Sequence, residues 1–111
     1  SYAEFVYRDA AVIDERTVEV TVENVAGRTG REVVQAYVRP PGGGGVDRPR
    51  RAFAGAAPVA LAAGESATVR VFLDELAFSR YDGGWTVDTG EYDVEIGRSV
   101  ADVRATVCVD R

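Results

Sequence analysis

Carboxylates are the residue type in this sequence whose number and spacing could carry catalysis. Two carboxyl groups held about 5–10 Å apart can act together as acid and base or as acid and nucleophile. Glu91, Asp93 and Glu95 alternate with apolar residues, and this spacing of two places them on the solvent-facing side of a strand. We therefore interpret the acidic residues between positions 74 and 95 as surface groups: Asp74, Glu75, Asp82, Asp88, Glu91, Asp93 and Glu95.

Other kinds of reactive site are excluded by composition. The 111 residues contain no histidine and one cysteine, Cys108, so nucleophile–base pairs and nitrogen or sulfur metal sites cannot be assembled within the chain. The four glycines at positions 42–45 are similar to a phosphate-binding loop, but no Lys-Ser, no Lys-Thr and no helical pattern follows them. We expect a flexible surface loop there, no catalytic residue, no cofactor and no metal.

Three arginines, Arg48, Arg50 and Arg51, form the one basic cluster. The formal net charge is −5, which disfavours binding to nucleic acid and to an anionic membrane surface. No stretch approaches the roughly 20 apolar residues that span a bilayer, and no signal peptide is recognisable, so we expect a soluble chain. Arg48, Arg50 and Arg51 are better suited to pairing with carboxylates, on a neighbouring domain or on this one.

Aromatic residues offer the remaining candidate for binding. Trp85 and Tyr81, together with Tyr92, could form a platform on which sugar rings stack. Tyr92 shares its spacing with Val94 and Ile96, so we place it in the core. For Trp85 two positions stay open, the edge of the core and an interface.

The elements that must position these residues are short strands separated by turns. Residues 18, 20 and 22 are valines that alternate with polar residues, as in a half-buried strand. The denser apolar run at 33–38 predicts a strand in the middle of a sheet, covered on both faces. Residues 74–81 could form only a short helical turn capped by Asp74. Strands are also expected near 51–57, 69–73, 85–87, 92–96 and 103–109, with reversals at 24–30 and 62–65.

About seven strands with turn signals every 8–12 residues predict an all-β sandwich of two sheets packed roughly 10 Å apart. We expect Phe53, Phe72 and Tyr92, together with Trp85 if it lies at the edge of the core, to be its bulky core residues. Asn24 and the glycines after it should supply positive φ angles to the turn at 24–30. The alternation of the last strand places Cys108 on its less apolar face.

Six ordered motifs resemble a known family. SYAEFVY is similar to its opening SYT-x-F-x-Y, VTVENVAGRTGREVVQAYV to V-x-N-x-G-x-x-x-G-x-EVVQLYV, and WTVDTGEYDVEIG to W-x-V-x-x-G-x-Y-x-V-x-VG. Shorter matches are Arg48-Pro49 with Ala54-Gly55, the AGES turn, and the LAFSRYD corner. Ala56, Ala62 and Ala63 depart from the pattern. These motifs span nearly the whole chain. The chain resembles the fibronectin type III-like domain at the C-terminal end of glycoside hydrolase family 3 enzymes.

The resemblance implies an immunoglobulin-like sandwich of about seven antiparallel strands, with residues 1–111 as one domain excised from a longer, β-glucosidase-like enzyme. All 13 basic residues are arginine, and alanine and valine dominate, a composition that suggests a bacterial source. In that family the nucleophilic aspartate and the acid/base glutamate belong to upstream domains, so this chain would be non-catalytic. Its partners would be the catalytic domains of the same parent chain and carbohydrate at the active-site entrance.

The loop at 42–45 could reach over that entrance. Arg48, Arg50, Arg51, Tyr81 and Trp85 are the candidates for interdomain or substrate-entrance contacts. An independent carbohydrate-binding module and a partner-binding sandwich remain alternatives. Whether the parent is cytoplasmic or secreted depends on sequence upstream.

Overall fold

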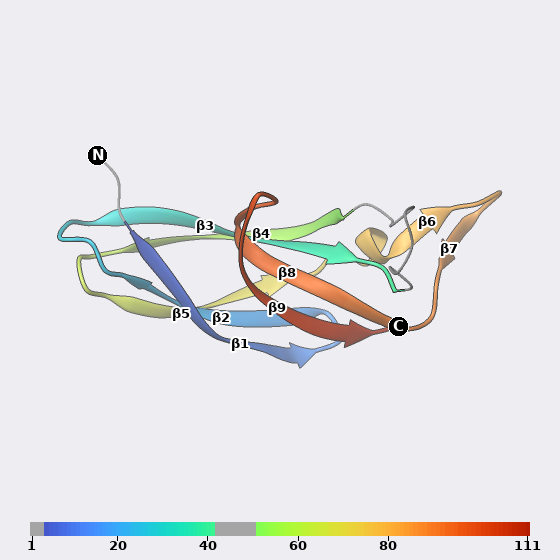
Figure 1. Cartoon of the computed structure of the whole chain (residues 1–111), viewed down its shortest axis with the longest axis horizontal. Helices are drawn as coiled ribbons and strands as arrows, with labels where there is room; N and C mark the ends of the chain where they lie inside the picture. Colours follow the sequence, from blue (N-terminus) through green and yellow to red (C-terminus); the bar gives the residue numbers. More distant parts are fainter. Residues whose placement is uncertain (1–3, 42–50) are drawn as a thin grey trace.

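The computed structural model describes residues 4–41 and 51–111. Within them, strands form two facing sheets and one separate hairpin (Figure 1). The three-stranded sheet has the order β1-β2-β5, the four-stranded sheet the order β4-β3-β8-β9, and β6 pairs with β7 alone. The strands are β1 (Phe5–Asp14), β2 (Thr17–Asn24), β3 (Gly30–Arg39), β4 (Ala52–Leu61), β5 (Ser66–Phe72), β6 (Ser79–Tyr81), β7 (Trp85–Val87), β8 (Glu91–Ser99) and β9 (Asp102–Asp110). The all-β sandwich is confirmed.

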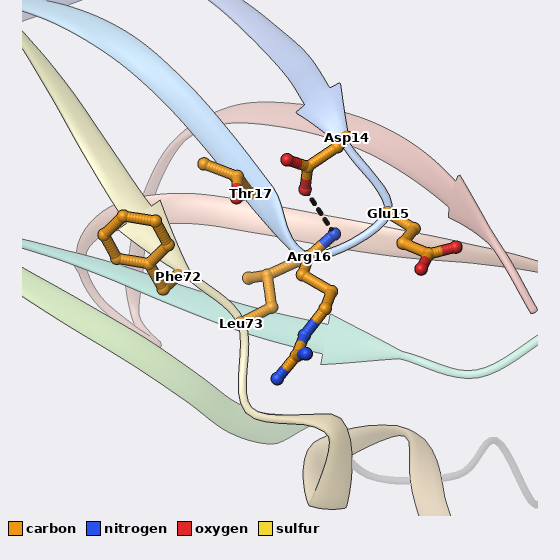
Figure 2. A pocket seen from close by; sticks show the side chains of 6 residues that line it. All are labelled: Asp14, Glu15, Arg16, Thr17, Phe72 and Leu73. Carbon is orange, nitrogen blue, oxygen red and sulfur yellow. Dashed lines mark hydrogen bonds between the residues drawn. The ribbon is translucent and has the colours of Figure 1, made fainter.

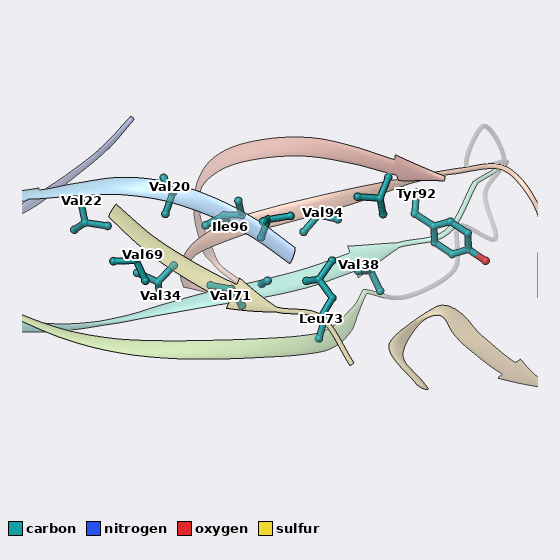
Figure 3. Packing of buried hydrophobic residues seen from close by; sticks show 14 of the residues in the cluster. Val20, Val22, Val34, Val38, Val69, Val71, Leu73, Tyr92, Val94 and Ile96 are labelled. Atoms are coloured by element: carbon teal, nitrogen blue, oxygen red, sulfur yellow. The ribbon is translucent and has the colours of Figure 1, made fainter. Parts of the chain in front are cut away.

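Alternation along β2 and β5 builds one wall of the core. Val18, Val20 and Val22 are fully buried, whereas Glu19, Thr21 and Glu23 point outward, as predicted from their spacing. Val20 lies opposite Val69 on β5 in antiparallel register. Figure 3 shows Val20, Val22 and Val69 packed with Val34, Val38, Val94 and Ile96 of the other sheet.

Strand β3 lies between β4 and β8, so its position in mid-sheet is confirmed. The expectation that both of its faces are covered is wrong: Val34, Ala36 and Val38 are buried, but Val33 is 44% exposed and Tyr37 is half-buried. The outer face of this sheet is not covered by another layer of the described residues. Pro58 is tolerated in β4 because β4 is an edge strand, where a missing N–H interrupts no further ladder.

The aromatic residues of the core differ from those expected. Tyr92 is buried as predicted, at 1% exposure, and it packs edge-to-face on Phe78 with ring centroids 5.0 Å apart. Phe5 is also buried. Phe53, Phe72 and Trp85 are 56%, 72% and 71% exposed, so their assignment to the core is wrong. Phe53 and Phe72 lie on the sides of β4 and β5 that face away from the opposite sheet. Trp85 lies on the separate hairpin.

The reversal between β2 and β3 is confirmed, but by a different mechanism. None of its described residues has a positive φ. Instead the fully buried Asn24 side chain organises the turn: its amide donates to the carbonyl oxygens of Arg28 (2.8 Å) and Leu61 (3.0 Å) and accepts from the Ala26 N–H (3.0 Å). Asn24 therefore joins two connections at the same end of the sandwich.

The segment at 74–81 is a 3₁₀ turn followed by a strand. The turn, η1 (Glu75–Phe78), begins as predicted at Asp74, whose carboxylate accepts the Leu76 N–H at 3.0 Å. The three residues of β6 then pair with β7. The described residues form nine strands rather than about seven. The two additional strands are β1 and β6, which the spacing of apolar residues did not distinguish from the segments around them.

Candidate interaction site

The β6–β7 hairpin extends beyond one end of the sandwich (Figure 1). Its turn is closed by a hydrogen bond from the Asp82 N–H to the carbonyl oxygen of Gly84 at 2.9 Å, and Gly83 adopts a φ of 68°, which glycine tolerates without strain. The hairpin is a two-stranded sheet of its own and is not hydrogen-bonded as a strand to either larger sheet.

One face of the hairpin is aromatic. Tyr81 lies directly across from Trp85, and their rings meet edge-to-face with centroids 5.5 Å apart and an interplanar angle of 80°. The two residues are 68% and 71% exposed. Val87, two residues after Trp85 and therefore on the same face, is 47% exposed. Of the two positions left open for Trp85, the structure places it at the surface of the described chain.

The other face is polar and holds the hairpin to the core. The Arg80 guanidinium donates to both carboxylate oxygens of Asp88, at 2.7 and 3.0 Å, and these bonds hold the pKa of Asp88 below its usual value. The backbone oxygen of Asp88 accepts the hydroxyl of buried Tyr92 at 2.7 Å. Burial in turn raises the pKa of that hydroxyl. A chain of bonds from Arg80 to Tyr92 thus fixes the base of the hairpin.

Of the three arginines in the cluster, Arg51 is the one that lies within the described residues. Its guanidinium forms an ion pair with Glu95, and the Arg39 guanidinium lies 3.8 Å from the same carboxylate. The Glu95 side chain is 13% exposed, so its assignment to the solvent-facing side with Glu91 and Asp93 is wrong in one respect: two arginines cover it. Arg48, Arg50 and the glycines at 42–45 lie outside the described residues.

A buried carboxylate that sequence reasoning missed lies on the core side of β3. Glu32 is 6% exposed; it accepts the Tyr7 hydroxyl at 3.0 Å, and the Nε of Arg98 lies 3.0 and 3.2 Å from its two oxygens. Burial and the Glu32 charge raise the pKa of Tyr7. The signal was available in the spacing, because Glu32 shares the parity of Val34 and Ala36. Its oxygens are occupied by partners from β1 and β8, which is typical of a structural rather than a reactive carboxylate.

A hollow lies between the β1–β2 turn and the end of β5 (Figure 2). It has a volume of about 580 Å³ and is lined by Asp14, Glu15, Arg16, Thr17, Phe72 and Leu73. The Asp14 carboxylate accepts the Arg16 N–H at 2.8 Å, a bond that lowers the pKa of Asp14 and stabilises the turn itself. The hollow is wide and open, and of its two carboxylates that of Asp14 is already used by the turn.

Among the described residues, no group of three or more potential metal ligands is found. Cys108 is exposed, a point that the alternation of its strand left open. Partial desolvation and a hydrogen bond to Asp93 raise the pKa of its thiol. In the described part of the chain no helix has the length and apolar character needed to cross a bilayer.

Comparison with known proteins shows the family. A family model described as the fibronectin type III-like domain matches residues 32–100. An exo-α-(1→6)-L-arabinopyranosidase of Bifidobacterium breve is 40% identical over 98% of this chain, and a thermostable β-glucosidase B of Acetivibrio thermocellus is 37% identical over 93%. The aligned segment is 15% of each enzyme, so this chain spans about one seventh of the length of these relatives.

Solved structures agree with the family match. The β-glucosidase DesR from Streptomyces venezuelae, in complex with D-glucose, superposes on 98% of this chain with a TM-score of 0.85 and 32% identity, over 15% of its own length. A family 3 β-glucosidase from Bifidobacterium adolescentis gives a TM-score of 0.81 and 37% identity, over 98% of this chain and 17% of its own. The chain therefore belongs to the fibronectin type III-like domains, of the kind that family 3 glycoside hydrolases contain as a small part of their length.

Proposed function

We propose that this chain is a non-catalytic accessory domain of a family 3 glycoside hydrolase, which packs on the catalytic domains of the same parent chain and helps to shape the substrate entrance. One observation carries the proposal. Relatives named for two different glycosides, an L-arabinopyranoside and a β-glucoside, match this chain at 40% and 37% identity along nearly its whole length. A segment shared so evenly between different specificities is better explained as a scaffold than as the part that reads the sugar.

The charged groups of the described residues support a scaffold role. Glu32 is bound by Arg98, Glu95 by Arg51, and Asp88 by Arg80. A carboxylate that acts as nucleophile or acid must reach the substrate, and each of these is engaged by an arginine within the domain. Their pairing stabilises loops and sheet faces instead.

The contacts with the catalytic domains are assigned, as part of the same proposal, to Tyr81, Trp85 and the arginines at 48, 50 and 51. The exposed ring pair of the hairpin supports this assignment for Tyr81 and Trp85. Arg51 already pairs with Glu95, so any contact it makes would use guanidinium nitrogens not held by that carboxylate. The loop at 42–45 is proposed to lie near the substrate entrance.

For the parent enzyme we propose hydrolysis of terminal glycosidic bonds with retention of configuration, by two carboxylates of its other domains. The test compares three proteins: the full-length parent, the parent lacking residues 1–111, and the 111-residue chain. Each is assayed with an aryl β-D-glucoside and an aryl α-L-arabinopyranoside. We expect turnover of one or both substrates by the full-length parent, none by the isolated chain, and a lower melting temperature after the deletion.

Turnover by the isolated chain would contradict the non-catalytic role. Unchanged melting temperature and kcat/KM after the deletion would contradict packing on the catalytic domains. In the full-length enzyme, removal of the glycines at 42–45 should change KM for oligosaccharides more than KM for the short aryl glycosides. Equal effects on both kinds of substrate would remove the loop from the substrate entrance.

The exposed Trp85 also favours a second candidate, an independent carbohydrate-binding module. Titration of the isolated chain with cello- and xylo-oligosaccharides and with insoluble glucans distinguishes the two. Saturable binding would support the module, and its absence would support the accessory domain.

A further inference from the structure

The β6–β7 hairpin is amphipathic, with Ser79, opposite Val87, as the one polar residue on its apolar side. Tyr81, Trp85 and Val87 form one face, which we call the aromatic face, and they are 68%, 71% and 47% exposed. Arg80 and Thr86, which pair across the strands, lie on the other face. Strands that alternate in this way normally bury their apolar face against another layer of protein. The described residues provide no such layer for this one.

The hairpin is nevertheless held in a defined position. A two-stranded hairpin alone is at best marginally stable in water. Here its base is fixed by the two bonds from Arg80 to Asp88, and Asp88 is fixed by the Tyr92 hydroxyl. The aromatic face is therefore presented on a support anchored in the core, so little conformational entropy would be lost on binding a partner.

The outer face of the three-stranded sheet differs from the aromatic face because it carries charged pairs. It is crossed by ion pairs, Arg8 with Glu23 at 2.6 Å and Arg70 with Glu19 at 3.3 Å. The aromatic face has no charged residue among its three members. Clusters of tryptophan and tyrosine at the centre of an apolar patch are typical of the residues that dominate protein–protein binding energy.

We propose that the aromatic face of the β6–β7 hairpin docks into an apolar recess on the remaining part of its own parent enzyme, with Trp85 as the anchor. This rests on the proposed function, which supplies the partner. The relatives are about seven times longer than the segment they share with this chain, so most of such an enzyme lies outside it. A sugar ring fits less well, because the two rings are nearly perpendicular and offer no flat double platform, and because Val87 extends the apolar face toward the sandwich.

The test places the same substitutions in two contexts, the 111-residue chain and the full-length parent. Trp85→Ala is compared with Trp85→Phe, which keeps an anchor ring, and with the control Phe72→Ala. Phe72 matches Trp85 in exposure, at 72%, but lies on the outer face of the ion-paired sheet. Thermal unfolding and the rate of chymotryptic cleavage are measured in each context.

We expect Trp85→Ala to leave the melting temperature of the isolated chain within about 2 °C of the parent sequence, since Trp85 buries little there. In the full-length enzyme it should release the domain and accelerate its cleavage by about tenfold or more, the size of effect that loss of an interface anchor produces. Trp85→Phe should restore most of the protection, and Phe72→Ala should change neither context.

Three results would overturn the docking proposal. The first is an active, full-length hydrolase in which Trp85→Ala and Phe72→Ala behave alike, a result that leaves the accessory function intact. The second is a saturable change in the fluorescence of Trp85, the only tryptophan of the 111 residues, when cellobiose or xylobiose is added to the isolated chain. The third is a dimer of the isolated chain, seen by sedimentation, that Trp85→Ala dissociates.

Discussion

Tyr92 links the core to the hairpin, and its substitution gives the sharpest test of the structure. The residue is 1% exposed, its ring packs on Phe78, and its hydroxyl donates to the carbonyl oxygen of Asp88. Truncating a buried aromatic residue to alanine costs about 3–5 kcal/mol. That range already includes the loss of ring contacts; the edge-to-face pair, worth about 0.5–1.5 kcal/mol, and the hydrogen bond, worth about 1 kcal/mol, place Tyr92 in its upper half. We expect Tyr92→Ala to lower the free energy of unfolding by about 4–5 kcal/mol.

Two companion variants separate the contributions. Tyr92→Phe keeps the ring and removes only the hydroxyl, so it should cost about 1–2 kcal/mol. Tyr81→Ala removes the same kind of side chain from a position that is 68% exposed, and in the isolated chain it should change stability by about 0.5 kcal/mol or less. Urea unfolding followed by far-UV circular dichroism measures all four proteins, with unchanged m-values as the check that each unfolds from the same folded state.

The result that refutes this reasoning is a loss below about 1 kcal/mol for Tyr92→Ala, which would mean that the side chain is not part of the packed core. A loss for Tyr81→Ala equal to that for Tyr92→Ala would be equally damaging, because burial is the only difference on which the two expectations depend. A Tyr92→Phe variant as stable as the parent chain would show that the bond to Asp88 does not stabilise the base of the hairpin.

Further expectations concern close packing, a buried charge and pH. Gly97→Ala should cost about 2–3 kcal/mol in urea unfolding, because a Cβ there would overlap backbone atoms of β9; full stability would contradict that close approach. Glu32→Ala should cost about 2–3 kcal/mol, less than the 3–5 of a fully buried pair because the Arg98 side chain is 39% exposed; a cost below about 1 kcal/mol would be inconsistent with this pairing. Arg80→Gln should raise the pKa of Asp88 toward its usual value in a carboxyl NMR titration, and an unchanged pKa would show that Arg80 does not lower it. Because the folded pKa of Asp88 is depressed, its contribution to stability is present above the unfolded value of about 3.9 and is lost as pH falls through the folded value; Arg80→Gln should weaken this acid-side loss.

The candidate site was only partly predictable. Tyr81 and Trp85 could be named from residue type, but their pairing across a three-residue turn requires β6, which the short segment after Asp74 does not reveal by periodicity. The ion pair of Arg51 with Glu95 joins residues far apart in the sequence, so no local pattern could indicate it. Glu32, by contrast, was predictable from its parity with the buried residues of β3, had an acidic residue been allowed at a core position.

The sequence by itself determined most of the strands and, for β2, β5 and β8, the face that each buries, because period-two alternation of apolar and polar residues acts locally and holds whatever the neighbouring strands are. It also determined the family, through motifs that run through strands such as β3 and β8 and through the turns between strands. Only the tertiary structure decided which aromatic residues fill the core. Phe5, Phe78 and Tyr92 do so, while Phe53, Phe72 and Trp85 stay exposed. Aromatic side chains suit either face of a pleated sheet, so their burial depends on which face meets the other sheet, and long-range packing decides that.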